Sequence, residues 1–286
     1  MKDTDIEVLG EDPRKLRRKK RNIQLALGIF AIVLIVIVLF LILRQSKRTS
    51  EITSTDETYT PTEGDVGKTV SDSLSVDTIP FTLEEMEING NKYRCFQLVN
   101  AELELALYND IDTTDTAIVF VTQAANIRGD NNKIIGDFIY KGDSMAKGCP
   151  NASTLGFCAI FGGKTIIGKA NPTTFLDSAK NDSGFFFRQY ALVNDNGFES
   201  FESEAKSYRR ALCIKDGNVM VVESIDKITL SAFAEALFDY DISNAVNLMG
   251  GKNLDEWYVK DGKREVLFIN TREPNPNRNY LIFRAK

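Results

Sequence analysis

The 286-residue chain contains no histidine, and this absence limits the chemistry that it can perform. Histidine is the commonest general base, and it supplies the Ser-His-Asp and Cys-His nucleophile systems and most zinc sites. Proton transfer and ligand recognition must therefore depend on carboxylates, hydroxyls, Arg, Lys and backbone groups. We accordingly expect neither a metal centre nor a cofactor.

The four cysteines, Cys95, Cys149, Cys158 and Cys213, have spacings that match no metal-binding pattern. Cys149 and Cys158 are close enough in sequence to bridge a short loop. However, four cysteines allow three pairings, and buried free thiols are an equal alternative. Spacing alone leaves their state open.

Four separated stretches between Gly184 and Gly251 resemble, in their order, the phosphodiester glycosidase domain family. This family includes a lysosomal N-acetylglucosamine-1-phosphodiester α-N-acetylglucosaminidase and bacterial exopolysaccharide-associated proteins. Upstream, Thr122–Ile127 looks like a weaker form of the family's Asn-Gly segment, so the resemblance covers about Thr116 to Gly251. The stretches are Gly184-Phe-Phe-Phe-Arg-Gln-Tyr-Ala-Leu-Val193 with Gly197, Ser207-Tyr-Arg-Arg-Ala-Leu-Cys213, Asp216-Gly217 through Glu223-Ser224, and Phe233–Leu237 followed by Asn244-Ala-Val-Asn-Leu-Met-Gly-Gly251.

The resemblance implies a carbohydrate or sugar-phosphate ligand and hydrolysis of a sugar-1-phosphodiester or related linkage in envelope or exopolysaccharide glycans. Arg209 and Arg210 both offer the planar fork that binds phosphate through two hydrogen bonds. Because neighbours on a strand point to opposite faces, at most one lines a pocket, and Arg210 is favoured over Arg209. The other implied ligand contacts are Asn126, Gln189, Ser207, Asn247, Gly250 and Gly251. Polar side chains such as Gln189 and Asn126 equally serve to satisfy buried backbone groups.

Cleavage of a glycosidic bond normally requires two carboxyl groups, and here the sequence departs from the family. Met249 stands before the two glycines, where an Asp is common, and methionine cannot transfer a proton. The nearest substitutes are Glu223, Asp255 and Glu256, none of them at the matching position. The predicted catalytic set is Glu223, Arg210 and Ser224.

Three functions remain open on this sequence. The first is an active enzyme that uses another carboxylate. The second is a catalytically inactive carbohydrate-binding or envelope-assembly module of the same fold. The third is a tethered sensor or protein-interaction domain. Two carboxyl groups roughly 5–9.5 Å apart in a cleft would favour the enzyme.

Periodicity and turn residues predict the elements that must position these side chains. Many hairpins and few helices indicate an α+β domain with a mixed, largely antiparallel sheet. A helix should begin after Thr229 as N-cap, with Leu230, Phe233, Ala234, Leu237 and Phe238 on its buried face. The expected strands include Ala117–Thr122, the hairpins Gly156–Phe161 with Thr165–Lys169 and Arg210–Ile214 with Val219–Glu223, a continuous Gly184–Val193, a hairpin around Asp261-Gly262, and Tyr280–Arg284.

The N-terminal part predicts where this domain works. The apolar run Ile23–Leu43 is long enough to span a bilayer, and the basic cluster before it orients the N-terminus toward the cytoplasm. A cleaved signal peptide is the weaker alternative, because no small-residue cleavage pattern follows Leu43. We expect a cytoplasmic tail (1–22), a transmembrane helix (23–43), a flexible Ser/Thr-rich linker (44–80) and one folded domain (81–286). The protein would be a single-pass inner-membrane protein whose main domain is periplasmic or extracellular.

Charge divides unevenly between these parts. Residues 1–48 hold 11 basic and 5 acidic residues, whereas the remaining 24 basic and 35 acidic residues give the rest a net charge of −11. An acidic domain argues against nucleic acid as a partner, because binding to phosphate backbones depends on neutralising their charge. An anionic ligand would need a local basic cluster.

Overall fold

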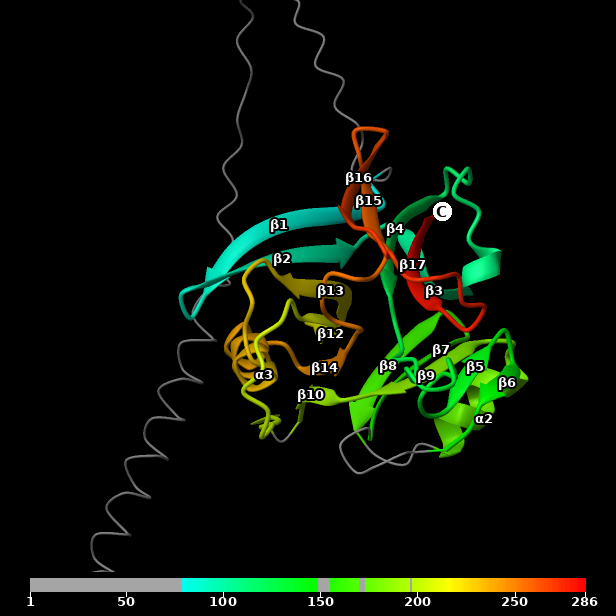
Figure 1. Ribbon diagram of the computed structural model, residues 1–286, viewed down its shortest axis with the longest axis horizontal. Coiled ribbons are helices and arrows are strands. Elements are labelled where there is room, and N and C mark those ends of the chain that lie inside the picture. The colour runs from blue at the N-terminus through cyan, green and yellow to red at the C-terminus, as the bar shows by residue number, and fades with distance from the viewer. Residues whose placement is uncertain (1–78, 149–154, 170–172, 196) are drawn as a thin grey trace, which may run out of the picture. The chain divides into compact units, whose positions relative to one another are not determined.

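A computed structural model describes residues 79–148, 155–169, 173–195 and 197–286 (Figure 1). The predicted tail, transmembrane helix and nearly all of the linker lie outside these residues. Within the described ranges, no helix is long and apolar enough to cross a membrane. The described residues belong to one compact unit, and the buried hydrophobic side chains found among them lie between Phe81 and Phe283.

Three antiparallel sheets build this unit, and no parallel pair occurs among the described strands. The α+β prediction is confirmed, with three sheets in place of one. The seven-stranded sheet has the order β1 (Phe81–Ile88), β2 (Asn91–Leu98), β13 (Asn218–Ser224), β12 (Arg210–Lys215), β14 (Asn244–Asn247), β10 (Ala191–Asn194), β11 (Gly197–Phe198). The second has the order β16 (Lys263–Phe268), β15 (Glu256–Lys260), β4 (Ile118–Gln123), β17 (Asn279–Ala285), β3 (Ala101–Leu107). The third has the order β6 (Asp143–Ala146), β5 (Phe138–Tyr140), β9 (Phe185–Gln189), β7 (Gly156–Phe161), β8 (Lys164–Lys169).

One hydrophobic core lies between the three sheets. Each sheet contributes inward-facing side chains to it, among them Phe96 and Leu212 from the first, Phe120 and Phe283 from the second, and Phe187 from the third. The rings of Phe96 and Phe120 are 4.7 Å apart, and Phe120 is equally close to Phe283. This aromatic contact joins the first two sheets at the centre of the molecule.

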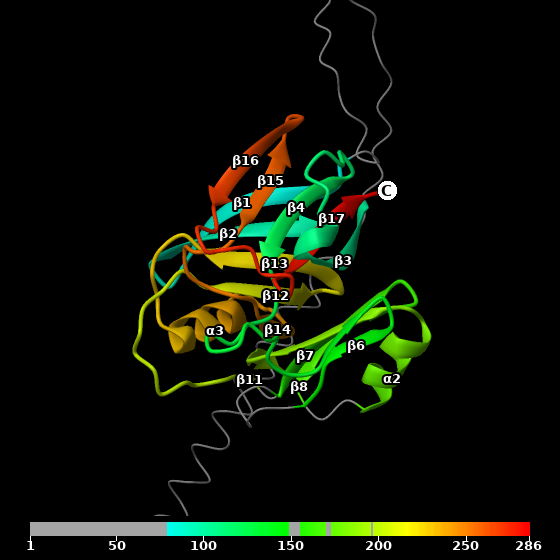
Figure 2. The same ribbon diagram turned by 45° about the vertical axis from the view of Figure 1, so that its right-hand side comes forward.

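The two α-helices of the described part cover different sheets (Figure 2). Helix α2 (Thr173–Asn181) packs on β7 and β9, whereas α3 (Leu230–Asp239) packs on β10. Thr229 caps α3 as predicted, since its hydroxyl accepts a hydrogen bond from the backbone N–H of Ala232 at 3.1 Å. Phe238, expected on the buried face, is 45% exposed, because it packs at the edge of the sheet, where its ring lies 5.7 Å from that of Phe198 in β11.

The predicted hairpins are confirmed, but the predicted strand Gly184–Val193 is wrong as a single element. The chain leaves the third sheet after Gln189 and joins the first sheet at Ala191, so β9 and β10 belong to different sheets. Gly156 permits this crossing, because a Cβ there would lie 2.3 Å from the backbone nitrogen of Ala191. A larger residue at position 156 would collide with the crossing backbone.

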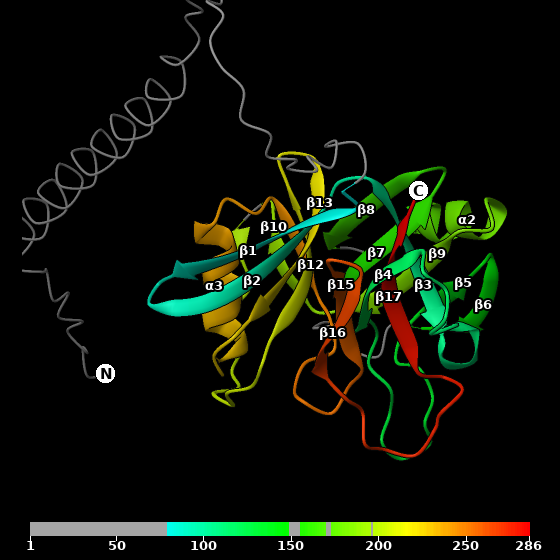
Figure 3. The same cartoon turned by 90° about the horizontal axis from the view of Figure 1, so that it is seen from above.

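Three cysteines lie in the described strands, and Cys95, Cys158 and Cys213 are all free and buried. The sequence left open a bridge between Cys149 and Cys158. Cys149 lies outside the described residues, and Cys158 is free, with its side chain in the central core. Figure 3 shows the molecule from above, with β17 beside β4 and the β15–β16 hairpin at the edge of the same sheet.

Candidate functional site

One end of the central core is charged. Side chains alternate between the two faces of a strand, so residues two positions apart share a face. The side chains that enter the core include Phe96, Leu212 and Val221. On each of these three strands a charged side chain two residues away enters the same interior space: Arg94 on β2, Arg210 on β12 and Glu223 on β13. Glu256 enters it from the second sheet, two residues before Tyr258. Four strands thus direct charged groups to one place.

Arg210 is the centre of this cluster and is fully buried. Its Nε donates a hydrogen bond to Glu256 Oε2 at 2.6 Å and lies 3.4 Å from Glu223 Oε2. Its Nη1 donates to the carbonyl oxygen of Gly251 at 3.1 Å. Charged and backbone acceptors together hold the guanidinium in one orientation.

The two carboxylates are close neighbours. Because their Oε2 atoms lie 2.6 Å and 3.4 Å from the same Arg210 nitrogen, these two oxygens are at most 6.0 Å apart. Glu223 Oε1 also accepts a hydrogen bond from Arg94 Nη1 at 2.7 Å. Two arginines therefore contact Glu223, whereas Glu256 contacts only Arg210 among the described basic side chains.

The surroundings of Glu256 favour its protonated form. Burial and the neighbouring negative charge of Glu223 raise the pKa of Glu256 from 4.5 to about 8, and the positive charge of Arg210 opposes this rise. At neutral pH Glu256 is therefore protonated, beside a Glu223 that two arginines contact.

Several polar atoms of the cluster lack a hydrogen-bond partner within the described residues. Arg210 Nη2 is a buried donor without a hydrogen-bond partner, and Glu223 Oε2 and Glu256 Oε1 accept no hydrogen bond, although Glu223 and Thr122 lie close enough to Glu256 to shift its pKa. Phe268 covers them, with its ring centre 4.6 Å from Arg210 Cζ and 5.5 Å from the ring of Tyr208. Unsatisfied buried groups are costly, so they indicate a place where a ligand or a proton completes the network.

The paired glycines lie beside this cluster, where the carbonyl of Gly251 contacts Arg210. Gly251 has a φ of +91°, and its N–H donates to the carbonyl of Tyr208 at 2.9 Å. A Cβ on Gly250 would lie 2.7 Å from that same carbonyl oxygen. Met249 donates its backbone N–H to the carbonyl of Ala124 at the end of β4. This turn therefore ties the first sheet to the second beside Arg210.

Three other predicted site residues contact nearby backbone groups. Ser224 Oγ accepts from the backbone N–H of Arg209 at 2.8 Å. The Arg209 guanidinium donates to the carbonyls of Ile228 and Ala205, outside the charged cluster. Ser207 forms a bridge with Ile228, although its Oγ lies 3.9 Å from where a Cβ on Gly251 would be. These residues position the segment before β12.

The remaining three predicted contacts form no described hydrogen bond with the charged cluster. Gln189 is buried at the end of β9, and its Nε2 has no partner within the described residues. Asn247 shares its face of β14 with Ala245, which packs toward α3 and away from Arg210. Asn126 follows β4, and its backbone carbonyl accepts from Ile135 at 2.9 Å. No described hydrogen bond joins any of the three side chains to Arg210.

The resemblance pointed to Glu223 and Arg210 but left Glu256 as one of three substitutes and gave no role to Arg94 or Phe268. A signal for Glu256 is present in the sequence, because this acid directly precedes the apolar run Trp257-Tyr-Val259. Its partner Arg210 lies 46 positions away in sequence, so spacing alone could not pair them.

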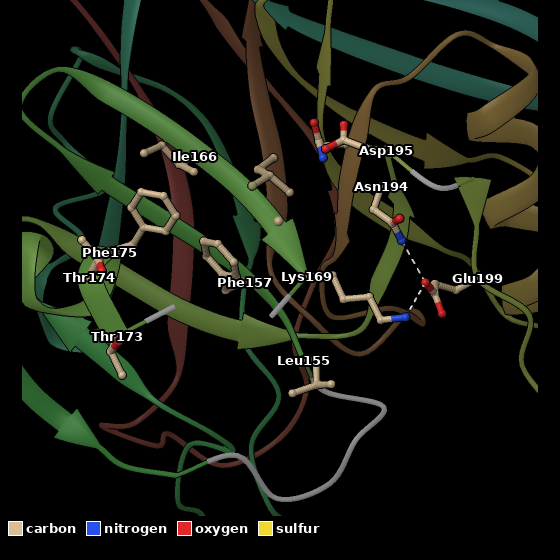
Figure 4. A pocket seen from close by; sticks show the side chains of 13 residues that line it. Leu155, Phe157, Ile166, Lys169, Thr173, Thr174, Phe175, Asn194, Asp195 and Glu199 are labelled. Atoms are coloured by element: carbon tan, nitrogen blue, oxygen red, sulfur yellow. Dashed lines mark hydrogen bonds and ion pairs between the residues drawn. The ribbon is translucent and has the colours of Figure 1, made fainter. Parts of the chain in front are cut away.

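A separate groove of about 880 Å³ lies beyond the other end of β10 and β14 (Figure 4). Phe157, Phe175 and Ile166 form its apolar side, and Lys169, Asn194 and Glu199 lie across from them. Glu199 Oε1 accepts hydrogen bonds from Lys169 Nζ at 2.6 Å and Asn194 Nδ2 at 2.9 Å. None of the predicted site residues lines this groove.

Comparison with known proteins identifies relatives by structure alone. No family model and no curated protein sequence matches the chain. The fold is similar to the catalytic domain of a zebrafish N-acetylglucosamine-1-phosphodiester α-N-acetylglucosaminidase auto-inhibited by its pro-peptide. The TM-score is 0.50 at 11% identity, over 72% of this chain and 82% of that chain.

A hypothetical protein from Synechocystis gives the same TM-score of 0.50 and identity of 11%, over 72% of this chain and 62% of that chain. A putative exported protein from Burkholderia pseudomallei is similar with a TM-score of 0.45 at 10% identity, over 74% of this chain and 76% of that chain. The resemblance stated from the sequence is confirmed at the level of the fold.

Proposed function

We propose that this protein hydrolyses sugar-1-phosphodiester or related linkages in envelope or exopolysaccharide glycans. The observation that carries the proposal is the pair of carboxyl groups, Glu223 and Glu256, held by one buried arginine, with the pKa of Glu256 raised far enough for it to act as an acid. Glycosidases need one protonated and one ionised carboxyl group. The glycosidase-like fold supports the same class of reaction.

In this mechanism Glu256 is the general acid and Glu223 the nucleophile. Glu256 donates its proton to the oxygen that leaves the anomeric carbon, while Glu223 Oε2 forms a bond to that carbon. Water then displaces Glu223 and loses its proton to the ionised Glu256. The oxygen separation of at most 6.0 Å is below the roughly 6.5–9.5 Å of inverting enzymes, which leaves no room for a water between the carboxyl groups and favours direct attack by Glu223.

A local set of cations supports an anionic substrate for this acidic domain. Lys252 Nζ lies 5.4 Å and Lys227 Nζ 5.9 Å from the ring centre of Tyr208, which contacts the Phe268 ring over Arg210. Neither lysine forms an ion pair with a described residue. We infer that they attract the phosphate and that Arg210 Nη2 binds one of its oxygens once Phe268 moves aside.

The location of this activity rests on the N-terminal sequence. We propose that residues 23–43 anchor the protein in the inner membrane and that residues 44–80 tether the folded domain on the periplasmic or extracellular side. The substrate would then be material of the envelope, which agrees with a glycan linkage.

A second candidate function is a catalytically inactive carbohydrate-binding or envelope-assembly module. The near-complete burial of both carboxylates, with exposed fractions of 1% for Glu223 and 0% for Glu256, favours it. The groove of Figure 4 supplies an open surface with apolar and polar walls, as small-molecule sites usually have. In this case the charged cluster would serve the structure alone.

Turnover by the purified 71–286 fragment separates the two functions. The fragment is incubated with UDP-N-acetylglucosamine and with a panel of p-nitrophenyl phosphodiesters. We expect hydrolysis by the wild type and a fall in kcat of about 10²-fold or more for Glu256→Gln and Glu223→Gln, because each removes an acid or a nucleophile. Glu265→Gln on exposed β16 is the matched control and should retain full activity.

Equal activity of Glu256→Gln and the wild type would overturn the assignment of the general acid. A silent wild type whose Met249→Asp variant gains turnover would establish the inactive module, since one restored carboxylate would then be sufficient for catalysis.

A further inference from the structure

A second cavity, of about 420 Å³, opens on the outer face of the sheet β16-β15-β4-β17-β3. Trp257, Tyr280 and Val121 line it and point away from the central core, opposite in direction to Glu256. Neither α2 nor α3 packs on this face in the described part of the chain (Figure 2). Its volume is within the range of small-molecule sites, about 300–1,000 Å³.

The rim of this cavity exposes apolar surface. Ile269 is 65% exposed and Val266 is 52% exposed, and they are the two most exposed large hydrophobic residues of the described chain. Both come from the β16 strand and the segment after it. Isolated exposed hydrophobic residues are ordinary, but two at the mouth of an aromatic-lined cavity mark a surface that binds an apolar group.

The acidic side chain of the wall, Asp255, is already occupied. Asp255 Oδ2 accepts a hydrogen bond from the Tyr280 hydroxyl at 2.7 Å and lies 3.4 Å from Arg278 Nη1. Its Oδ1 accepts from the backbone N–H of Asn270 at 3.0 Å. These contacts neutralise Asp255 and leave it little capacity to bind the hydroxyl groups of a sugar. Recognition inside the cavity therefore depends on burying hydrocarbon.

One charge at the wall is not neutralised. The Arg264 guanidinium lies over the Trp257 ring, 4.0 Å from its centre, and donates one hydrogen bond to the carbonyl of Thr113. It forms no ion pair with any residue that the structure describes. Arginine has five N–H donors, so several remain for an anion beside the cavity.

From these features we propose that the cavity binds an anionic amphiphile, with its hydrocarbon chain against Trp257, Val266 and Ile269 and its anionic head group on Arg264. The ligand class is a single-chain hydrocarbon that carries one phosphate or carboxylate. This site does not depend on the proposed hydrolase activity, because Trp257 and Glu256 face opposite sides of β15.

The fluorescence of Trp257 tests this proposal directly, because it is the only tryptophan of the chain. The 71–286 fragment, which contains every described core residue, is titrated with octyl phosphate, inorganic phosphate or octanol below the concentrations at which they aggregate. We expect a saturable change with octyl phosphate, none with inorganic phosphate, and about tenfold weaker binding of octanol. Shorter alkyl phosphates should bind about fourfold more weakly for each methylene removed.

Two variants locate the binding site. Val266→Asp places a negative charge at the rim and should weaken octyl phosphate binding at least tenfold. Val99→Asp is the matched control, because Val99 is 46% exposed and lies at the turn between β2 and β3, away from this cavity; it should bind as the wild type does. Arg264→Gln should weaken octyl phosphate binding to the level of octanol and leave octanol binding unchanged.

Three results would each overturn the proposal. The first is the absence of a saturable fluorescence change with octyl phosphate. The second is an equal loss of octyl phosphate affinity in Val266→Asp and Val99→Asp. The third is an equal affinity of the wild type for octanol and octyl phosphate. All of these readouts are independent of catalysis, so an inactive enzyme with a normal titration would reject the proposed function and retain this site.

Discussion

The side chains of the central core form two levels, an aromatic level and a charged level, which lie two residues apart along the strands. The two levels contribute differently to the protein. At one level Phe96, Phe120 and Phe283 contact each other through their rings, and this burial stabilises the fold. At the other level Arg210, Glu223 and Glu256 are equally buried, but removing their charges from water is costly. Stability therefore explains the aromatic level, whereas the buried charges are better explained by the catalytic role proposed for the two carboxyl groups.

Removal of Arg210 should give the largest effect. Arg210→Met leaves two buried carboxyl groups without their shared cation, so we expect a loss of about 3–5 kcal/mol in the free energy of unfolding, measured with urea at pH 9. Arg209→Met is the matched control. Its guanidinium contacts only backbone carbonyls, and its loss should cost about 1 kcal/mol. Equal losses in the free energy of unfolding would mean that Arg210 contributes no more to stability than an arginine at the surface.

Glu256→Gln should remove a pH dependence of the free energy of unfolding that arises from the charged level and not from the aromatic level. The pKa of Glu256 is about 8 in the folded protein and near 4.5 unfolded, so the folded state binds the proton more tightly. Its contribution to stability is fully present below pH 4.5 and is lost as the pH rises through about 8.

We therefore expect urea midpoints of the wild type to fall between pH 5 and pH 9 more steeply than those of Glu256→Gln. Glu102→Gln, at an exposed position of β3, is the control and should keep the wild-type slope. If the slopes of Glu256→Gln and the wild type coincide, Glu256 is ionised throughout this range.

Phe120→Leu should give the smallest effect and complete the comparison. The substitution keeps an apolar side chain of similar volume at the aromatic level, so we expect a loss of about 1 kcal/mol that is the same at pH 5 and pH 9. Thermal melts at both pH values measure this. A loss that depends on pH would show that the two levels are coupled.

Local sequence patterns predicted the hairpins and α3 because their signals lie within a few residues. The turns Gly162-Gly163 and Asp216-Gly217 and the Thr229 cap formed as expected. The Gly184–Val193 run was not predicted correctly, because its residues are equally apolar in both sheets that it enters. The break at Tyr190 depends on Gly156, which lies far away in sequence and leaves no mark on the run itself.

The candidate site was predictable only in part. Arg210 and Gly251 were predicted from the resemblance and do contact each other at 3.1 Å. Glu256 as the partner of Arg210 required knowledge of which strands face each other across the core. Asn247 was misplaced relative to Arg210 because the resemblance gives its position in the chain but not the face of β14 that carries it.

The crossing at Tyr190 has a mechanical consequence. A single uninterrupted peptide segment belongs to the third sheet at Gln189 and to the first sheet at Ala191, two residues later. Neither sheet can slide along the other at this point without stretching covalent bonds. Any opening that admits a ligand to Arg210 must therefore come from the other side of the cluster, where the ring of Phe268, the last residue of β16, lies over the guanidinium.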